Sequence, residues 1–415
     1  MGYRARSRPG LLQRRNVLLG AVAVFVFTVI RYLVSSAPPY RLPRPIVSLT
    51  STPDRVSTSL APTVWSLLRQ SLPPEAIHVY LPRSSRDASA LLAKEPVFQH
   101  PLVSVRYVQD EGPATKFLAV LREAYERART SPSVLDHPLL VLDDDHVYSS
   151  ALVESLIGGW VAHGREAAVA LRGWRVREDL QWGVAWADVK RHVVEGWRLR
   201  DSYQVGVITA NEGYIVTPAM FLPPAIRAEP PPTTSSLASV SPIFSYAPPI
   251  PPAAHLVDDI WLSGTLAAHS VPRFVVPLRT PEPPSVDITH GAATAARQSS
   301  DGGSDARSPL EKHLAEHGQS RKDANDETLR WFGPAWALDR ELVRSDKGGA
   351  WVLPERTIEQ RPLWYDSRRA DERRKSGSRG EPEWAGPLSR ARSQIARWAL
   401  YRRARSRWGN RVLWN

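Results

Sequence analysis

Residues 138–148 read PLLVLDDDHVY, and this stretch decides the expected fold. A short apolar run, residues 138–142, ends directly in three consecutive carboxylates, Asp143, Asp144 and Asp145. An apolar run of this length predicts a buried strand. Because ligands of open α/β sheets bind beyond the carboxyl ends of the strands, the three carboxylates stand where a binding site is expected.

Strand and helix patterns alternate on both sides of this stretch. Apolar segments predict further strands at residues 46–50, 77–81, 103–108, 167–176, 205–216 and 274–276. Helical periodicity and capping residues predict helices at residues 61–70, 88–94, 115–129, 151–163 and 258–269. Repeated units of this kind predict an α/β domain with a mostly parallel sheet and helices on both faces.

The net charge of +12 in 415 residues is confined to the two ends of the chain. Residues 361–415 hold 15 Lys and Arg against 5 Asp and Glu, and residues 1–15 hold five Arg and no acid. The body between them is slightly acidic, which argues against nucleic-acid binding by the body. The chain has no Cys, so disulfides and thiolate metal sites are excluded.

The amino-terminal pattern predicts a membrane anchor. A basic segment, residues 1–15, precedes an apolar segment, residues 16–34, in which only Arg31 is charged. This predicts a cytoplasmic tail, a transmembrane signal anchor and a lumenal remainder of the chain, which is the topology of a single-pass type II protein of the secretory pathway, in the Golgi. A cleaved signal peptide that ends near Ala37 is the alternative.

Composition divides the rest of the chain. Residues 35–45 are expected to form a stem and residues 46–280 the α/β domain, with a Pro-rich insertion at 223–252. Residues 281–326 are polar and rich in small residues, so we expect a flexible linker there. Residues 327–415 form a basic region rich in Trp and Arg, which we expect to be largely disordered.

The acidic triplet suggests a cation site. Three adjacent carboxylates repel one another unless a cation lies among them, and hard oxygen ligands suit Mn²⁺ or Mg²⁺ held against a diphosphate. If the backbone stays extended, Asp143 and Asp145 point the same way. A solvated acidic turn or a capping cluster is the alternative interpretation of such a triplet.

A second acidic pair, Asp258 and Asp259, opens the predicted helix 258–269. Asp at a helix start is often only a cap, but a second carboxylate beside the triplet could take the proton from an acceptor hydroxyl. Two weaker candidates are Lys116, which could face phosphate, and Gly213 in the segment Asn-Glu-Gly-Tyr, which could allow close approach of a sugar. An ordinary surface lysine and an ordinary turn glycine are their alternatives.

These motifs, in their order, resemble a family. The segments SLTSTPDR (48–55), GPATK (112–116), LDDDHVY (142–148), VDDIWLSG (257–264) and VPRFVVP (271–277) look like poorly characterised glycosyltransferases of the nucleotide-diphospho-sugar transferase superfamily. The resemblance covers residues 45–277 and lies in the combination of motifs. It implies a Rossmann-like GT-A fold, a nucleotide-sugar donor, a glycan, glycoprotein or glycolipid acceptor, and a divalent metal, usually Mn²⁺.

The resemblance also implies roles for individual residues. The nucleotide sugar would contact Thr50, Pro53, Arg55, Lys116, Asp143, Asp144, Gly213 and Trp261. Asp145, with Asp143, would bind the metal, and His290 is a further candidate ligand. Asp259, or else Asp258, would be the acceptor base, which implies inversion at the anomeric carbon. The segment before the second acidic pair departs from the family, because it reads Asn-Glu-Gly where consecutive glycines are common.

Two other functions fit parts of the sequence. A non-catalytic membrane-tethered scaffold or carbohydrate-binding module fits the large polar fraction and the Trp-rich tail. Binding of an acidic polymer by residues 361–415 fits their charge.

Overall fold

The described residues of the computed structural model are 42–177, 179–182, 192–228, 237–245, 250–251, 254, 256–278, 280, 284–288 and 320–336. The chain divides into two compact units, Met1–Pro43 and Arg44–Asn415. The architecture below is that of the second unit.

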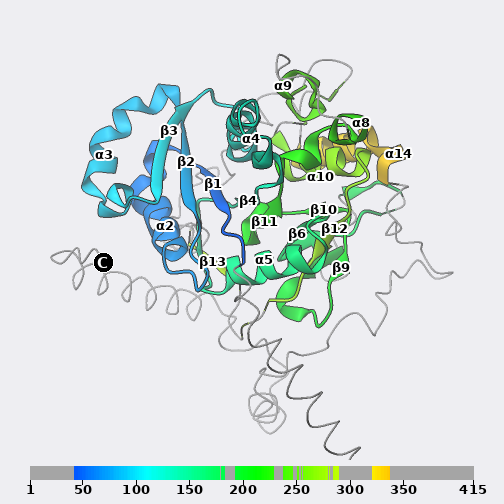
Figure 1. Ribbon diagram of the computed structural model, residues 1–415, viewed down its shortest axis with the longest axis horizontal. Helices are drawn as coiled ribbons and strands as arrows, with labels where there is room; N and C mark the ends of the chain where they lie inside the picture. Colours follow the sequence, from blue (N-terminus) through cyan, green and yellow to red (C-terminus); the bar gives the residue numbers. More distant parts are fainter. Residues whose placement is uncertain are drawn as a thin grey trace, which may run out of the picture. The chain divides into compact units, whose positions relative to one another are not determined.

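The second unit is built on an eight-stranded sheet of order β3-β2-β1-β4-β11-β6-β12-β9 (Figure 1). In that order the strands are Val103–Val108, Ala76–Pro82, Ile46–Thr50, Leu139–Val141, Tyr214–Val216, Ala168–Ala170, Arg273–Val275 and Tyr203–Gln204. The first four are parallel, β11 is antiparallel between β4 and β6, and β12 is parallel to β6. The predicted α/β class with a mostly parallel sheet is confirmed.

Helices cover both faces of this sheet. Helices α4 (Thr115–Ala128) and α10 (Asp258–Ala268) lie on one face, and α2 (Ala61–Leu67) and α5 (Leu152–Ala162) lie on the other (Figure 1). The remaining helices are short: α3 (Ser89–Lys94), α8 (Pro224–Ala228), α9 (Leu237–Val240), α13 (Arg321–Trp331) and α14 (Gly333–Trp336). Helix α4 buries Phe117, Leu118 and Leu121 against the sheet, as its periodicity predicts.

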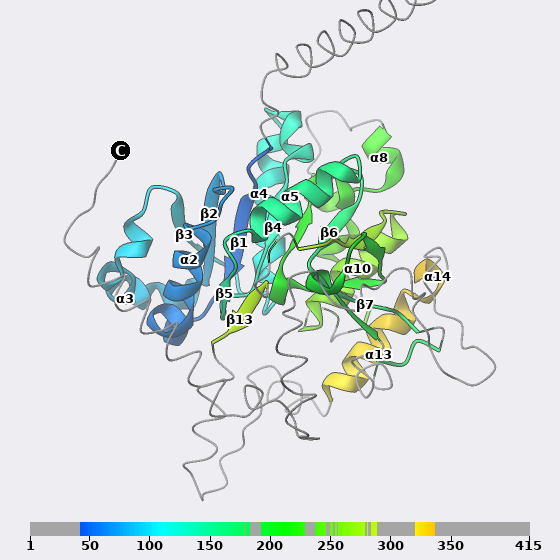
Figure 2. The ribbon, with the colours of Figure 1, turned by 90° about the horizontal axis from the view of Figure 1, so that it is seen from below.

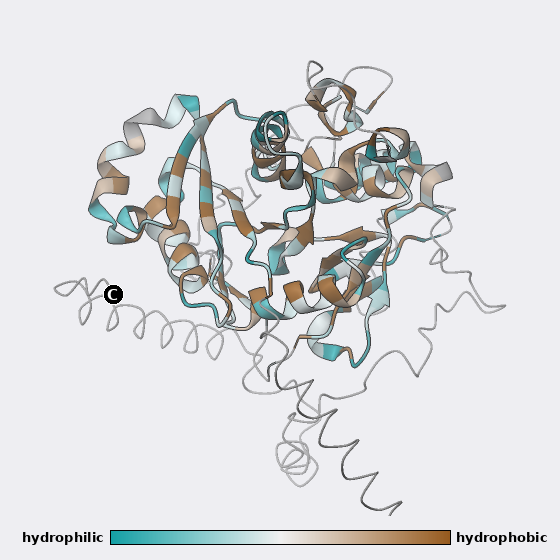
Figure 3. Ribbon diagram, viewed as in Figure 1, coloured by the Kyte–Doolittle hydropathy of each residue, from teal (hydrophilic) through white to brown (hydrophobic). Residues whose placement is uncertain are grey.

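Alternation along the strands explains why both faces are covered. In β4 and the residue after it, Leu139 and Val141 join the core that contains Phe117, whereas Leu140 and Leu142 are buried outside that core. Both sets are apolar because a central parallel strand packs against helices on each side. Figure 3 shows the consequence, with hydrophobic residues along the central strands and a hydrophilic outer side on α4.

Two long predicted strands are broken into shorter ones. The segment 167–176 splits into β6 and β7 (Arg172–Trp174), which pairs with β8 (Val193–Glu195) and β10 (Val207–Ile208) in a separate three-stranded sheet. The segment 205–216 splits into β10 and β11 around a turn at Ala210–Glu212. The turn needs a residue with a positive φ at position 213, and Gly213, with a φ of 80°, adopts this conformation without strain.

The expected flexible linker at 281–326 contains regular structure. Strand β13 (Ser285–Asp287) pairs with β5 (His146–Tyr148), directly after the acidic triplet (Figure 2). Helix α13 begins at Arg321 with Ser320 as its side-chain cap, and it packs against α10. Low hydrophobicity in the linker hid these two elements, because each is held by pairing or packing with a distant segment rather than by its own composition.

The expected single-pass type II topology is contradicted. In the part of the chain that the structure describes, no helix combines the length and apolar composition needed to cross a membrane. The longest helix there, α4, has 14 residues, against about 20 for a spanning helix. Residues 16–34, on which the predicted anchor rested, lie outside the described residues. We therefore retain neither the membrane topology nor the Golgi location.

Candidate functional site

The strand order reverses between β1 and β4, and we call the region beyond the carboxyl ends of these two strands the crevice. The chain runs outward from β1 to β2 and β3, then returns to the other side of β1 as β4. Such a reversal of strand order is where open α/β sheets bind their ligands. Strand β1 ends at Thr50, and β4 ends at Val141 just before the acidic triplet, so the triplet lies at this reversal.

The three carboxylates have three different environments. Asp143 Oδ1 accepts a hydrogen bond of 2.8 Å from Lys116 Nζ. Asp144 accepts from Ser51 Oγ at 2.5 Å and from Arg55 Nη1 at 2.6 Å. Asp145 lies 2.7 Å from His146 Nδ1 and 3.6 Å from Arg55 Nη1. The triplet is therefore a set of separately paired groups and not a solvated acidic turn.

Lys116 joins the two acidic motifs. Its ammonium lies 2.8 Å from Asp143 and 2.6 Å from Asp258 at the start of α10. Burial alone would lower the pKa of Lys116, but the carboxylates of Asp143 and Asp258 raise it well above its ordinary value. Lys116 is therefore a permanent positive charge between two segments that are more than a hundred residues apart in the sequence.

The backbone of Ala210 makes a second connection between the motifs. Its amide donates to Asp259 Oδ1 at 3.2 Å, and its carbonyl accepts from the amide of Asp143 at 3.3 Å. Burial and the neighbouring Asp258 raise the pKa of Asp259 well above its ordinary value. The site thus holds one carboxylate, Asp259, that binds a proton unusually strongly for an aspartate.

Within the triplet, the pKa values of Asp143 and Asp144 are shifted in opposite directions. Burial opposes ionisation of Asp143, but Lys116 outweighs it and lowers the pKa of Asp143. Burial raises the pKa of Asp144 to about 6, although Arg55 and Ser51 act in the opposite direction. The site therefore contains carboxylates with unlike proton affinities, which is typical of functional sites.

Two of the predicted contacts to a nucleotide sugar, Asp144 and Lys116, have side chains that are turned inward. The Asp144 side chain is 6% exposed and its oxygens are taken up by Ser51 and Arg55. The Lys116 side chain is 7% exposed, and its ammonium faces two carboxylates, those of Asp143 and Asp258. Both side chains therefore have partners within the chain, and they support the site through these contacts.

Trp261 and Gly213 are both held by packing within the protein. Trp261 is 2% exposed, its indole donates to the carbonyl of Ile243, and its ring packs on Phe332, so it cannot form a wall for a sugar. Gly213 is required by packing, since a Cβ there would lie 2.6 Å from Leu142. A positive φ and a close neighbour, rather than a ligand, explain this glycine.

Five further predicted residues lie at the crevice. Asp143 and Asp145 are the part-exposed members of the triplet, with 31% and 18% of their side chains accessible. Arg55 is 32% exposed beside Asp145, and Thr50 ends β1 with its hydroxyl donating to Tyr80. Pro53 opens the short helix Pro53–Arg55 that carries Arg55. His290 lies outside the described residues.

Several residues of the site were missed by sequence reasoning. Ser51 anchors Asp144, and the hydroxyl of Tyr148 donates to the carbonyl of Asp143. Burial lowers the pKa of His146 but Asp145 outweighs it, so the pKa is raised. Tyr214 and Glu212 are buried beside the site with an unpaired side-chain oxygen each, as far as the described residues extend. The sequence signal that could have identified them is their position on either side of Gly213, in the segment Asn-Glu-Gly-Tyr.

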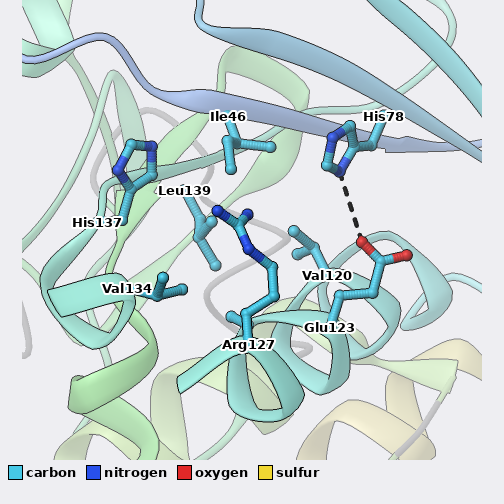
Figure 4. A pocket seen from close by; sticks show the side chains of 9 residues that line it. Ile46, His78, Val120, Glu123, Arg127, Val134, His137 and Leu139 are labelled. Carbon is cyan, nitrogen blue, oxygen red and sulfur yellow. Dashed lines mark ion pairs between the residues drawn. The ribbon is translucent and has the colours of Figure 1, made fainter. Parts of the chain in front are cut away.

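A pocket at the opposite end of the sheet is separate from this site. Its lining includes Ile46 and Leu139, the first residues of β1 and β4, and Figure 4 shows Arg127 between His78 and His137. Burial, with Arg106 and Arg127, lowers the pKa of His78 to about 4, so this histidine is neutral. Glu123 is already paired with Arg106. None of the residues that line this pocket belongs to the acidic crevice.

Comparison with known proteins gives little sequence likeness. No protein-family model and no curated protein matches the chain. Among solved structures, a mannosyltransferase from Pyrobaculum calidifontis in complex with GDP-Man and Mn²⁺ is similar at 14% identity over 95% of this chain and 96% of that chain, with a TM-score of 0.33.

Two further solved structures are similar. A 4-diphosphocytidyl-2C-methyl-D-erythritol synthase has 12% identity over 48% of this chain and 86% of that chain, with a TM-score of 0.28. Mouse xyloside xylosyltransferase 1 has 14% identity over 45% of this chain and 69% of that chain, with a TM-score of 0.27. At these TM-scores the likeness carries no argument, and the functional conclusion rests on the geometry of the crevice.

Proposed function

We propose that the protein is a glycosyltransferase that moves a sugar from a nucleoside-diphosphate donor to an acceptor hydroxyl. The observation that carries this proposal is the double contact of Lys116 with Asp143 and Asp258. It brings two acidic motifs together at the carboxyl ends of β1 and β4, where the fold favours ligand binding. Sugar transfer needs both a group that holds the donor and a separate group that accepts a proton.

Asp143, Asp145 and Arg55 form the donor side in this proposal. Arg55 is a fixed cation within reach of a diphosphate, and a guanidinium suits phosphate oxygens. Asp143 is assigned to the nucleotide, at its ribose. Thr50 and Pro53, at the end of β1 and in the short helix after it, line the same side.

Asp143 and Asp145 also suit a divalent cation, Mn²⁺ or Mg²⁺. Within the described residues no group of three or more His, Asp and Glu side chains is arranged to hold a metal. Cations of this kind are commonly held by one or two carboxylates together with substrate phosphates, so two part-exposed carboxylates fit the requirement. When bound, the cation offsets the negative charge of the departing nucleoside diphosphate.

Asp259 is assigned as the acceptor base. It takes the proton from the acceptor hydroxyl while the hydroxyl oxygen bonds to the anomeric carbon. The bond from that carbon to the diphosphate breaks, and its electron pair leaves with the nucleoside diphosphate. The raised pKa of Asp259 favours proton uptake. One direct displacement inverts the anomeric configuration.

The test is an assay of the full chain with a panel of nucleotide sugars, acceptors and Mn²⁺ or Mg²⁺. We expect release of nucleoside diphosphate with a glycosylated product, and loss of at least about 100-fold in rate for Asp259→Asn. Asp136→Asn is the matched control, because Asp136 is exposed at the far end of the sheet. Donor binding with no turnover on any acceptor would contradict the enzyme and favour a carbohydrate-binding module.

A further inference from the structure

The segment that follows β1 converges on Asp144, the middle carboxylate of the triplet. The hydroxyl of Ser51 donates to Asp144 Oδ2 at 2.5 Å, and Arg55 Nη1 donates to Asp144 Oδ1 at 2.6 Å. The hydroxyl of Thr63, in α2, donates to the main-chain carbonyl of Asp144 at 3.0 Å. Three donors from one stretch of the chain, residues 51–63, therefore hold a single residue of a distant stretch.

The Asp144 side chain is turned into the protein. It is 6% exposed, and each of its two carboxylate oxygens accepts a hydrogen bond from within the chain. Burial of a carboxylate is unfavourable unless a cation and hydrogen bonds compensate for it. Arg55 supplies that cation. The pair therefore ties the position of Arg55 to a fixed point just beyond the end of β4.

The guanidinium of Arg55 is only partly used by these partners. Its Nη1 lies 2.6 Å from Asp144 and 3.6 Å from Asp145, whereas Nε and Nη2 have no hydrogen-bond partner among the described residues. The Arg55 side chain is also 32% exposed. A guanidinium presents N–H donors along more than one edge, so one edge can bind a carboxylate while another binds phosphate oxygens.

The pairing fixes Arg55 before any ligand arrives. Arg55 is the last residue of the three-residue helix Pro53–Arg55, which has no side-chain cap. An arginine side chain has many rotamers, and holding one of them costs conformational entropy. Because the contact with Asp144 already selects a rotamer in the folded chain, a ligand that binds Arg55 loses less affinity to this ordering.

We propose that Asp144 is a positioning residue that holds the guanidinium of Arg55 so that its Nε and Nη2 atoms meet the diphosphate of the donor. Ser51 and Thr63 in turn hold Asp144. This inference rests on the proposed function, because it takes the ligand to be a nucleoside diphosphate. It gives the middle carboxylate of the triplet a role in donor affinity that acts through Arg55.

The test measures binding, so it needs neither an acceptor nor turnover. Calorimetric titration of the full chain with ADP, CDP, GDP and UDP, each with Mg²⁺, first identifies a nucleoside diphosphate that binds the wild type. We expect Arg55→Met to weaken its binding about tenfold, because a charge-assisted contact with phosphate is lost, and Asp144→Asn to weaken it about fivefold. Asp54→Asn removes an exposed carboxylate from the same short helix and is the control, with binding within about twofold of wild type.

The double variant of Arg55→Met with Asp144→Asn separates positioning from a general effect on the fold. If Asp144 acts through Arg55, Asp144→Asn weakens binding no further once Arg55 is Met. Equal losses in both backgrounds, or wild-type affinity in Asp144→Asn, would overturn the positioning role. If Asp144→Asn does not fold, Ser51→Ala takes its place under the same criteria, because it removes one donor from Asp144 and leaves the ion pair intact.

The outcomes also distinguish this inference from the proposed function. Weakened binding in Arg55→Met with none in Asp144→Asn would overturn the role of Asp144 and leave the donor site standing. A wild-type chain that binds none of the nucleoside diphosphates would overturn the proposed function, and the role of Asp144 with it.

Discussion

Lys116 places one buried positive charge between carboxylates from two distant segments, of which Asp258 is largely buried and Asp143 is part-exposed. The pairing of Lys116 with Asp143 and Asp258 stabilises the crevice only while all three are present. Removal of one member of such a group leaves the others buried without compensation.

We therefore expect Lys116→Met to lower the free energy of unfolding by about 3 kcal/mol. The physical reason is repulsion between Asp143 and Asp258 once the ammonium is gone. Denaturant unfolding at neutral pH measures it, and Lys94→Met, at an exposed position on α3, is the control. Equal midpoints for the two variants would show that Lys116 is not a structural bridge.

Glu212 gives a pH-dependent prediction. Burial raises its pKa from 4.5 to about 8, and its Oε2 atom is unpaired among the described residues. The folded chain thus binds this proton more tightly than the unfolded chain does. Unfolding releases the proton between about pH 4.5 and pH 8, so the contribution of Glu212 to stability falls as the pH rises through that window.

Glu212→Gln removes this loss. We expect its unfolding free energy, relative to wild type, to increase from pH 5 to pH 8 by up to about 1.4 kcal/mol per pH unit. Glu166→Gln, at an exposed position, is the control for the loss of one carboxylate. Parallel stability curves for Glu212→Gln and wild type would contradict the burial of a protonated acid here.

At the residue scale, the sequence predicts where a residue lies in the fold better than it predicts which side chains that residue contacts. Asp143 follows a predicted strand and Asp258 opens a predicted helix, and they were expected at one site on chemical grounds. The structure joins them through Lys116. That Arg55 pairs with Asp144 and that Lys116 bridges two motifs depends on side-chain geometry in the folded state. Neither contact follows from spacing in the sequence, so the intrachain partners of Lys116 and Asp144 could not be predicted.

At the element scale, helix α10 carries the second acidic motif and is buried on nearly all sides. The outer side of α10 is covered by α13 and α14, which lie next to it in Figure 2. Gly264 allows this contact, because a Cβ at that position would lie 2.2 Å from the ring of Phe332. The sequence pattern predicts a helix here. It could not reveal that α13 and α14 cover this helix, because they come after a long polar segment of the chain.

Gly264→Ala tests whether this packing supports the site. The added methyl group collides with Phe332, so we expect a loss of about 1–3 kcal/mol in stability and a lower transferase rate. Calorimetry and the activity assay measure the two effects. The double variant Gly264→Ala with Phe332→Ala should lose less stability than the sum of the single variants. Strict additivity would mean that the two residues are not in contact.

At the scale of the whole molecule, charge and chemistry are separated along the chain. The crevice is formed by residues between Thr50 and Asp259, whereas residues 361–415 hold most of the excess positive charge. The predicted α/β architecture is confirmed, since it depends on strand and helix periodicity that is local in the sequence. The small sheets at β5 and β7 were not predicted, because their partners β13 and β8 are short and distant.

A chain that ends at Gln360 is the test of this separation. We expect it to keep the transferase rate of the full chain and to elute from heparin at a lower salt concentration, because the basic residues that bind polyanions are removed. Assay and column chromatography of the two chains measure both. Loss of transfer with intact folding would place residues 361–415 in the catalytic apparatus.

The central claim is that the two acidic motifs form one nucleotide-sugar site. The most direct measurement is a crystal structure of the full chain with a nucleoside diphosphate and Mn²⁺, with the anomalous signal of manganese used to locate the cation. We predict the nucleotide at the carboxyl ends of β1 and β4, with its ribose at Asp143, the manganese signal at Asp145 and Asp259 facing open space beside the diphosphate. A nucleotide bound elsewhere, for example at the pocket around Arg127, or a manganese signal away from Asp143 and Asp145, would contradict it.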